Sequence, residues 1–301
     1  MLDKLEFLLL LARERHFGRA AEAAGVTQPT FSSAVKALEE NLGTALVERG
    51  SRFRGFTPEG ERVLEWARRL VGDARTMRQE LQSLKGNLSG HLRIGVVPTA
   101  LPFVPNLTVP FHKRFPAVRL SVFSATSAEI LARLENLEIE IGISYIDNEP
   151  IGRLSGIELY KEQFMLLVSA RSPLAHLKEM TWNDAGELPL CLLTPDIQGR
   201  RIIDEVLEEN GGCRMPTFES NSMMTLFTHV RTGQWMSIIP ARLIDAIDRP
   251  RQLKTIPLVA PQITKTIGLL IRGREPYSPT VSAFVAVARR VLGAVEALED
   301  A

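Results

Sequence analysis

The chain has little of what would place it in a specialised structural class. Its two cysteines, Cys191 and Cys213, are too few for a disulfide framework, and their spacing does not suit a metal pair. The 36 basic and 35 acidic residues nearly cancel, so the net charge of +1 identifies no partner. We expect a protein that keeps its thiols reduced and, at 301 residues, is long enough for more than one domain.

No long apolar run marks a membrane segment. The apolar stretch from Leu8 to Leu11 is short, has the charged residues Glu6 and Arg13 beside it, and is followed by no small-residue cleavage site. The sequence therefore predicts neither a signal peptide nor a membrane span, and it predicts a cytoplasmic location.

Signals for catalysis are also missing. The five histidines are scattered, without metal-ligand spacing or the context of a catalytic triad. No glycine-rich loop has the pattern that cradles phosphates. An enzyme would need a converging acid, base or nucleophile, and none can be assembled. We therefore predict a protein that is not an enzyme and uses no metal and no cofactor.

What the sequence does contain is a helix, a tight turn and a second helix within residues 17–32. Small and apolar residues recur at helical spacing after Phe17, and Gly25 is a typical helix stop. Thr27 is then a suitable N-cap, with Pro29 tolerated in the first turn of the next helix. This pattern predicts a helix-turn-helix.

The second helix has two distinct faces. Phe31, Val35, Leu38 and Leu42 form an apolar stripe that must face a core. The other side carries short or amide-bearing groups suited to base edges and phosphates in a DNA major groove. These candidate DNA-binding residues are Gln28, Pro29, Thr30, Ser32, Ser33 and Lys36. A merely solvated face is the alternative, because helix-turn-helix pairs also occur in proteins that bind no DNA.

A basic segment follows this helix. Arg49, Arg52 and Arg54 lie among glycines in a stretch that has the pattern of a hairpin-like wing. Arginines in such a wing contact flanking phosphates or a minor groove, which positions a protein on DNA without specifying much of the base sequence. A solvated surface loop is the alternative.

Together these motifs resemble the N-terminal domain of LysR-type transcriptional regulators. The matching runs are Arg19-Ala20-Ala21, residues 27–32, Ala37-Leu38-Glu39, Leu42-Gly43, Glu48-Arg49 and residues 56–60. One departure is Ser33, which stands close to where the family often has an arginine. The resemblance implies a winged helix-turn-helix at residues 1–58 of a bacterial transcription factor that binds double-stranded DNA, with RNA polymerase as a further candidate partner.

The region after the wing has the pattern of a long dimerising helix. From Pro58 to Ser89 apolar residues alternate by three and four positions, as in a coiled coil between two chains. The seam comprises Ala67, Leu70, Ala74, Met77, Leu81, Leu84 and Leu88. An amphipathic helix packed on its own domain is the alternative. In the resembling family this linker, here residues 59–89, pairs two chains, which implies a homodimer on a dyad-symmetric operator and, through paired regulatory domains, a homotetramer.

Residues 90–301 alternate between apolar strands and amphipathic helices, which predicts an α/β domain with largely parallel sheets. Strands are expected at residues 92–97, 119–123, 140–144, 164–169, 190–193, 236–239 and 267–271, and helices at 102–115, 127–137, 200–210, 223–232 and 279–298. The resemblance implies two subdomains like those of a periplasmic binding protein, with a small-molecule effector in the cleft between them. Subdomain I would comprise residues 91–161 and 267–301, and subdomain II residues 162–266.

Hydroxyl and amide residues gather where the expected strands lead into helices, the edge at which α/β proteins bind ligands. Free N–H groups at helix starts favour an anion, so we expect a small anionic metabolite. The candidate effector-binding residues are Thr99 and Ser127 first, then Ala100, Thr126, Ser144, Thr194, Gln198 and Asn221. Each polar one is alternatively an ordinary N-cap. Arg200, or helix dipoles alone, would compensate the effector's charge.

Three alternatives to an effector sensor stay open. Cys191 and Cys213 would form a thiol switch, as in some regulators of the resembling family, although the apolar strand around Cys191 favours a structural role. A ligand-blind architectural DNA-binding protein would show the same DNA geometry with every metabolite. A solute-binding protein with an unusual N-terminal extension is disfavoured by the missing signal peptide and by the heptad linker.

Overall fold

The computed structural model describes residues 1–48, 53–84, 88–147, 151–152, 154–211, 215–246, 251–273 and 277–299. The chain divides into two compact units, one of residues 1–87 with 135–138 and the other of residues 88–134 with 139–301. Among the described residues, none of the helices combines the length and the apolar character that crossing a membrane requires.

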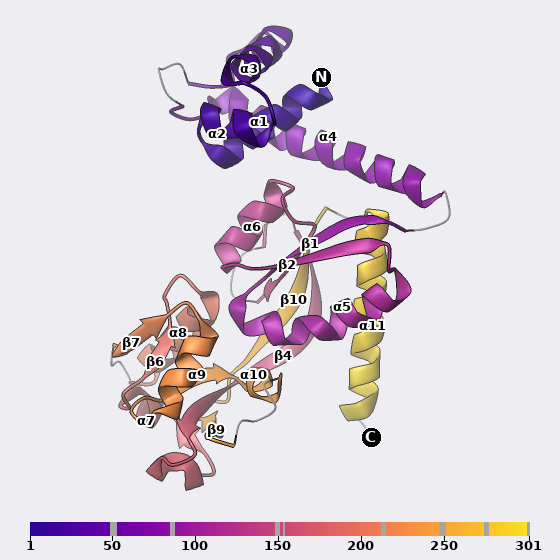
Figure 1. Cartoon of the computed structure of the whole chain (residues 1–301). Coiled ribbons are helices and arrows are strands. Elements are labelled where there is room, and N and C mark those ends of the chain that lie inside the picture. Colours follow the sequence, from indigo (N-terminus) through magenta and orange to yellow (C-terminus); the bar gives the residue numbers. More distant parts are fainter. Residues whose placement is uncertain are drawn as a thin grey trace. The chain divides into compact units, whose positions relative to one another are not determined.

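The first unit is helical, with a short hairpin (Figure 1). Its helices are α1 (Leu2–Glu14), α2 (Phe17–Ala23), α3 (Gln28–Leu42) and α4 (Pro58–Ser83). The predicted helix-turn-helix is confirmed as α2 and α3. Gly25 adopts a φ of 70° in the turn, and the Thr27 hydroxyl accepts a hydrogen bond from the amide of Thr30 at the start of α3.

Aromatic packing joins these helices. Phe31 on the predicted apolar stripe of α3 is fully buried, stacks on Phe7 of α1 with ring centroids 4.9 Å apart, and meets Phe17 of α2 edge-on at 6.2 Å. Val35 and Leu38 of the same stripe are buried, whereas Leu42, predicted to be its last member, is 40% exposed. The stripe therefore fixes α3 against α1 and α2 and leaves its opposite face to solvent.

The hairpin after α3 is tied to both neighbouring helices. The Glu39 carboxylate of α3 accepts hydrogen bonds from the amides of Leu46 (2.7 Å) and Val47 (3.1 Å), and Val47 pairs with Phe56 across an antiparallel bridge. Gly60, in the first turn of α4, lies so close to the hairpin that an added Cβ would be 2.0 Å from the carbonyl oxygen of Leu46. The start of α4 thus requires a glycine.

The helix α4 ends earlier than predicted. Its last residue is Ser83, with Leu84 as C-cap, whereas the heptad pattern predicted a helix to Ser89. Ala67 is buried in the core of the first unit and Leu88 packs on the core of the second, so neither belongs to an open seam. The exposed apolar side chains on and just after this helix are Trp66, Leu70, Met77, Leu81 and Leu84.

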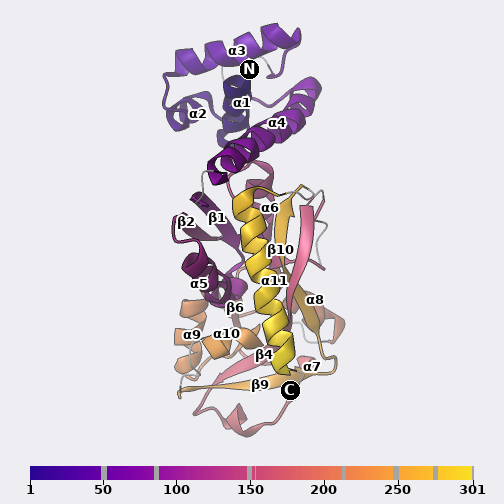
Figure 2. The same ribbon diagram turned by 90° about the vertical axis from the view of Figure 1, so that its right-hand side faces the viewer.

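The second unit is a two-lobed α/β domain (Figures 1 and 2). Its strands are β1 (Gly90–Val96), β2 (Val118–Ser124), β3 (Ile141–Tyr145), β4 (Leu154–Ser169), β5 (Met180–Thr181), β6 (Cys191–Leu193), β7 (Phe218–Ser220), β8 (Ser237–Pro240), β9 (Leu253–Val259) and β10 (Thr264–Arg272). Its helices are η1 (Pro98–Phe103), α5 (Val104–Arg114), α6 (Ser127–Glu135), η2 (Pro173–His176), α7 (Trp182–Gly186), α8 (Gln198–Glu209), α9 (Met223–Arg231), α10 (Ala241–Ala246) and α11 (Pro279–Glu299).

The expectation of largely parallel sheets is wrong. The strands are hydrogen-bonded in the order β2-β1-β3-β10-β4-β9-β5, with β8 also beside β4, and β6 pairs with β7. β1 is parallel to β2 and β3, but β10 is antiparallel to β3 and β4, and β4 is antiparallel to β8 and β9. The sheet is mixed because β4 carries the chain from subdomain I to subdomain II and β10 brings it back in the opposite direction.

The hydrophobic pattern of the sequence did not predict the shortest and the least apolar strands. β5 and β7 have two and three residues, too few to show an alternation. The first half of β4 and all of β9 mix buried, half-buried and exposed positions without a strict alternation, and β9 contains Pro257. These strands form because neighbouring strands hold them, not because of a strong local pattern.

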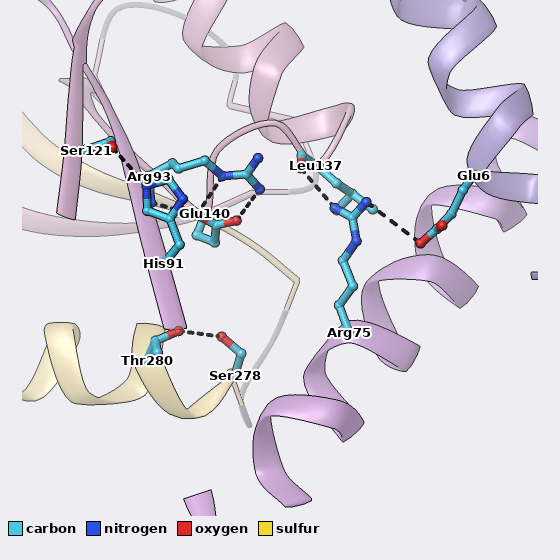
Figure 3. A network of polar contacts seen from close by, with 9 residues as sticks. All are labelled: Glu6, Arg75, His91, Arg93, Ser121, Leu137, Glu140, Ser278 and Thr280. Atoms are coloured by element: carbon cyan, nitrogen blue, oxygen red, sulfur yellow. Dashed lines mark hydrogen bonds and ion pairs between the residues drawn. The ribbon is translucent and has the colours of Figure 1, made fainter. Parts of the chain in front are cut away.

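Helices cover both faces of the sheet in subdomain I. At Gly142 of β3 an added Cβ would lie 2.5 Å from the Ile130 side chain of α6, so this helix packs directly on the strand. On the other face α5 and α11 meet, with the rings of Phe111 and Phe284 5.2 Å apart (Figures 1 and 2). Near the start of β1 the guanidinium of Arg93 donates to the Glu140 carboxylate at 2.5 Å (Figure 3).

We expect Gly60→Ala to destabilise the N-terminal unit by about 1–3 kcal/mol, because the new methyl group must displace the backbone of Leu46. Denaturant unfolding of the full chain measures this change through tryptophan fluorescence, to which Trp66 in α4 contributes. The matched control is Glu61→Ala, the exposed next position of the same helix. Equal unfolding midpoints for the two variants would contradict the steric argument.

Candidate functional site

The residues predicted to read DNA lie together on α3. Gln28, Pro29, Thr30, Ser33 and Lys36 are exposed and Ser32 is half-buried. Two of these side chains have local partners: the Thr30 hydroxyl is 2.9 Å from that of Thr27, and the Lys36 ammonium is 3.8 Å from the Glu40 carboxylate. Both partners are exposed, so a competing phosphate can displace them at small cost.

The wing is only partly described. Arg54 is exposed, whereas Arg49 and Arg52 lie outside the described residues. Phe53, next to Arg54, packs edge-on against Phe17 of α2 and Phe56 of the hairpin, with centroids 6.3 and 5.1 Å away. This aromatic contact holds the backbone of the wing beside the helix-turn-helix, so the Arg54 guanidinium is carried by a positioned segment.

A second polar site lies where α8 of subdomain II meets subdomain I. The Ser144 hydroxyl at the end of β3 donates to the Gln198 side-chain oxygen at 3.3 Å, and the Arg201 guanidinium donates to the Ser127 hydroxyl at 3.1 Å. Of these four residues, three were predicted effector ligands and only Arg201 was missed. The structure thus brings residues from β3, α6 and α8 together, which no local pattern could indicate.

The first turn of α8 also packs against Thr99. An added Cβ at Gly199 would lie 3.3 Å from both the Thr99 side chain and the Tyr145 hydroxyl, so the absence of a side chain permits this close approach. The Thr99 and Tyr145 hydroxyls are 3.4 Å apart. We call the six residues Thr99, Ser127, Ser144, Gln198, Gly199 and Arg201 the junction site.

The junction site holds hydrogen-bonding capacity that the described residues do not use. Ile197, the N-cap of this 12-residue helix, has no side-chain cap to offer, and its carbonyl accepts from the amides of Arg200 and Arg201 but not from those of Gln198 and Gly199. Gln198 is 2% exposed and its side-chain nitrogen has no hydrogen-bond partner within the described ranges. Since an uncapped helix start carries a partial positive charge, these donors favour a ligand with acceptor atoms and negative charge.

The other predicted effector residues lie differently. Thr126 caps α6 in a reciprocal bond pair with Glu129, Ala100 is fully buried in the core, and Asn221 is exposed. Thr194 is half-buried, and its hydroxyl is buried without a partner in the described part of the chain.

Arg200 does not supply the free cation that the sequence suggested. Its side chain is buried and donates to the carboxylates of Asp204 (2.7 Å) and Glu219 (2.6 Å), which ties α8 to β7. The next residue, Arg201, donates to the carbonyls of Pro195 and Asp196 and also reaches the Ser127 hydroxyl of subdomain I. On an amphipathic helix the sequence alone does not tell which of two adjacent arginines faces the core, and here the pairing partners on α8 and β7 decide it.

Sequence reasoning also missed a buried carboxylate. Glu162, on β4 where the strand passes between the subdomains, is completely buried and accepts hydrogen bonds from the hydroxyls of Tyr145 (2.6 Å) and Tyr160 (3.5 Å). Burial raises the pKa of Glu162 to about 7, although both hydroxyls oppose the shift. The available signal was its position between Tyr160 and Phe164, which share its face of the strand.

Cys191 is placed as a structural residue. Its side chain is fully buried in β6, and burial raises the pKa of the thiol to about 11. Cys213 lies outside the described residues. In the described ranges no group of three or more His, Cys, Asp or Glu side chains could hold a metal ion.

The match to known families covers both units. Residues 2–61 match the model described as "Bacterial regulatory helix-turn-helix protein, lysR family", and residues 85–293 match the "LysR substrate binding domain". The chain therefore belongs to the LysR family of DNA-binding transcriptional regulators, which combine a helix-turn-helix with a ligand-binding domain and are not enzymes.

Relatives and solved structures are similar over nearly the whole chain. The hydrogen peroxide-inducible genes activator of Escherichia coli O157:H7 is 28% identical over 291 residues, which are 95% of this chain and 93% of that protein. A full-length OxyR variant of Pseudomonas aeruginosa is 26% identical with a TM-score of 0.74, covering 96% and 97% of the two chains. Full-length CbnR bound to its target DNA has the same fold at 21% identity, with a TM-score of 0.60 and coverage of 97% and 99%.

We expect Glu162→Gln to raise the free energy of unfolding more at pH 8 than at pH 5. The folded-state pKa of this acid is raised, so its ionisation costs stability as pH rises from about 4.5 to about 7, by up to about 3 kcal/mol. Urea unfolding of the full chain at several pH values measures the difference. Glu158→Gln, an exposed position of the same strand, is the control, and parallel pH profiles for the two variants would refute the assignment.

We expect the Cys191 thiol to react with a disulfide reagent only after unfolding, because at pH 7 about one part in ten thousand is thiolate and the sulfur is buried. A Cys213→Ser variant leaves Cys191 as the single thiol, so thiol release can be counted in native buffer and in denaturant. Complete reaction within minutes in the native state would show that Cys191 is accessible.

Proposed function

We propose that the DNA binding of this regulator is controlled by a small anion bound at the junction site. The observation that carries the proposal is the start of α8, which has no side-chain cap. There the buried Gln198 nitrogen has no hydrogen-bond partner among the described residues, and Arg201 reaches Ser127 of the other subdomain. A carboxylate, phosphate or similar group there would accept from α8 amides and from side chains of both subdomains. No cofactor is required.

Such a ligand would act by changing how the two subdomains close on each other. Closure would alter the angle between paired regulatory domains and, through the α4 helices, the spacing of two DNA-binding units on their half-sites. The equilibrium shifts only if the ligand binds the two arrangements with different affinity.

The proposed partners follow from the family and from the exposed surfaces. CbnR, which shares the fold, is bound to its target DNA in the solved complex. For this chain we propose a dyad-symmetric double-stranded operator, RNA polymerase as a second partner, and a cytoplasmic location. The exposed apolar stripe on α4 would pair two chains, and contacts between regulatory domains would complete a homotetramer.

The likeness to peroxide-inducible activators does not lead us to propose a thiol switch at Cys191. A peroxide-sensing cysteine needs an accessible thiolate, whereas Cys191 is buried and its thiol pKa is raised. The unused donors of the junction site are a positive reason for a ligand. We therefore propose an effector sensor in preference to redox control.

A thermal-shift screen of the full chain tests the anion. Carboxylates, amino acids, phosphorylated metabolites, sulfate and phosphate are added, and a ligand at a hundred times its Kd should stabilise the chain by about 2.7 kcal/mol. We expect Arg201→Gln to reduce the response at least tenfold in affinity, equivalent to about 1.4 kcal/mol. The control is Arg119→Gln on the exposed edge strand β2. Equal responses in both variants would place the ligand elsewhere.

Substitutions on α3 and in the wing test the DNA-binding face. We expect Gln28→Ala to lose about 1–3 kcal/mol of discrimination between operator and random DNA, as for a lost base contact. Arg54→Ala should weaken binding to both DNAs alike and reduce the salt dependence, as for a lost phosphate contact. Fluorescence anisotropy at several salt concentrations separates the two effects. An equal loss on both DNAs for Gln28→Ala would rule out base reading by this residue.

A further inference from the structure

We propose that His16 is a further DNA-binding residue of this regulator: its imidazole caps α2 through Nδ1 and donates a hydrogen bond from Nε2 to a backbone phosphate beside the start of α3. Neither the helix-turn-helix pattern nor the basic wing gave this residue a role. The contact would extend the DNA-binding face proposed on α3, on which it rests, and it is independent of the anion at the junction site.

The His16 ring is bound to the first turn of α2. Its Nδ1 accepts hydrogen bonds from the amides of Gly18 (3.1 Å) and Arg19 (3.3 Å). An imidazole nitrogen that accepts carries no hydrogen, so the neutral ring has its one hydrogen on Nε2. The cap therefore occupies these two amides and leaves a donor on the other ring nitrogen.

That donor is available to a ligand. His16 is exposed, and its Nε2 donates to no other residue in the described part of the chain. Capping alone does not require an imidazole, because the shorter side chains of Ser, Asn and Asp are the preferred N-caps. Histidine adds a donor held farther from the backbone, on a ring whose orientation the cap fixes.

The ring lies beside the start of α3. A Cβ added at Gly18 would be 3.1 Å from Cε1 of His16 and 3.5 Å from Oε1 of Gln28, so both groups lie against the same small residue. Nε2 is bonded to Cε1, which puts the donor close to the Gln28 amide. In a helix-turn-helix on DNA, the N-terminal residues of the second helix contact base edges while the first helix crosses the phosphate backbone. His16 is therefore placed for a phosphate and Gln28 for a base.

The charges around His16 favour a phosphate. Arg15 and Arg19 are exposed, and the Arg19 guanidinium is 3.6 Å from the Glu14 carboxylate. The same carboxylate pairs with Arg13 at 2.8 Å. One carboxylate among three arginines leaves the stretch positive, which attracts the DNA backbone to the place where Nε2 can donate.

Two substitutions separate the cap from the donor. His16→Asn keeps an acceptor for the α2 amides but is too short to replace Nε2, whereas His16→Gln reaches farther with its amide NH₂ group but is a poor cap. In denaturant we expect His16→Asn to unfold at the wild-type midpoint and His16→Gln to unfold earlier. The control is His91→Asn, the same change at an exposed histidine of β1.

Fluorescence anisotropy of the full chain at several salt concentrations measures DNA binding. One duplex is an operator that the wild-type chain selects from random sequences, and the other is an unrelated duplex of equal length. We expect His16→Asn to lose about tenfold in affinity for both, as for a hydrogen bond to a charged group, with an unchanged salt slope because the lost donor is neutral. His16→Gln and His91→Asn should bind both duplexes nearly as the wild-type chain does.

Uncharged methylphosphonates, introduced one at a time into the operator backbone, identify the phosphate. At the contacted phosphate the replacement should weaken the wild-type chain about tenfold more than it weakens His16→Asn, because the variant has no bond there to lose. At all other phosphates the two proteins should lose equal affinity.

Three results overturn the proposal. Wild-type affinity of His16→Asn for both duplexes shows that the ring only caps α2, and a loss confined to the operator shows that it acts on base reading through Gln28. Equal methylphosphonate losses at every position show that the ring contacts no phosphate. Base reading by Gln28 fails separately, when Gln28→Ala loses the same affinity on both duplexes, and that result leaves the His16 contact standing.

Discussion

A buried carboxylate organises the region where the two subdomains of the regulatory domain meet. Glu162 lies on β4, where the strand leaves one subdomain for the other, and a carboxylate without water must receive hydrogen bonds from nearby donors. Tyr145 supplies one at 2.6 Å. That requirement links the end of β3 to β4 across the intervening strand β10, and the same tyrosine contacts Thr99 and the first turn of α8. The junction site therefore adjoins one buried acidic group whose hydrogen bonds come from tyrosine hydroxyls.

The DNA-binding unit likewise depends on close contacts, here between its helices and the hairpin. Glu39 ties α3 to the hairpin through two backbone amides, and Gly60 lets α4 begin directly against the carbonyl of Leu46. The exposed face of α3 and the wing are consequently held by the same few contacts. A protein that contacts bases with one element and phosphates with another needs the two elements at a fixed distance. Both sets of contacts must be made to the same DNA site.

The relatives share the fold of this chain, and that shared fold does not fix the chemistry of its site. Regulators named for peroxide responses share almost the entire length of this chain, yet the described cysteine here is a buried core residue with a raised thiol pKa. The anion proposed for the junction site would give this chain a different means of responding. A shared architecture supports many inputs, because the input is determined by a few side chains placed on it.

The local sequence by itself determined the helix-turn-helix, the apolar face of α3, the long amphipathic α4 and the α/β alternation, because each depends on periodicity and capping within a short stretch. It also pointed to Thr99, Ser127, Ser144 and Gln198. Only the tertiary structure decided that these four lie at one junction, that Arg201 and not Arg200 faces it, and that β10 runs antiparallel beside β3 and β4. The tertiary structure also decided that Glu162 is buried with Tyr145 as a hydrogen-bond donor, since Tyr145 belongs to a different strand and the local sequence showed only Tyr160 and Phe164 on the same face.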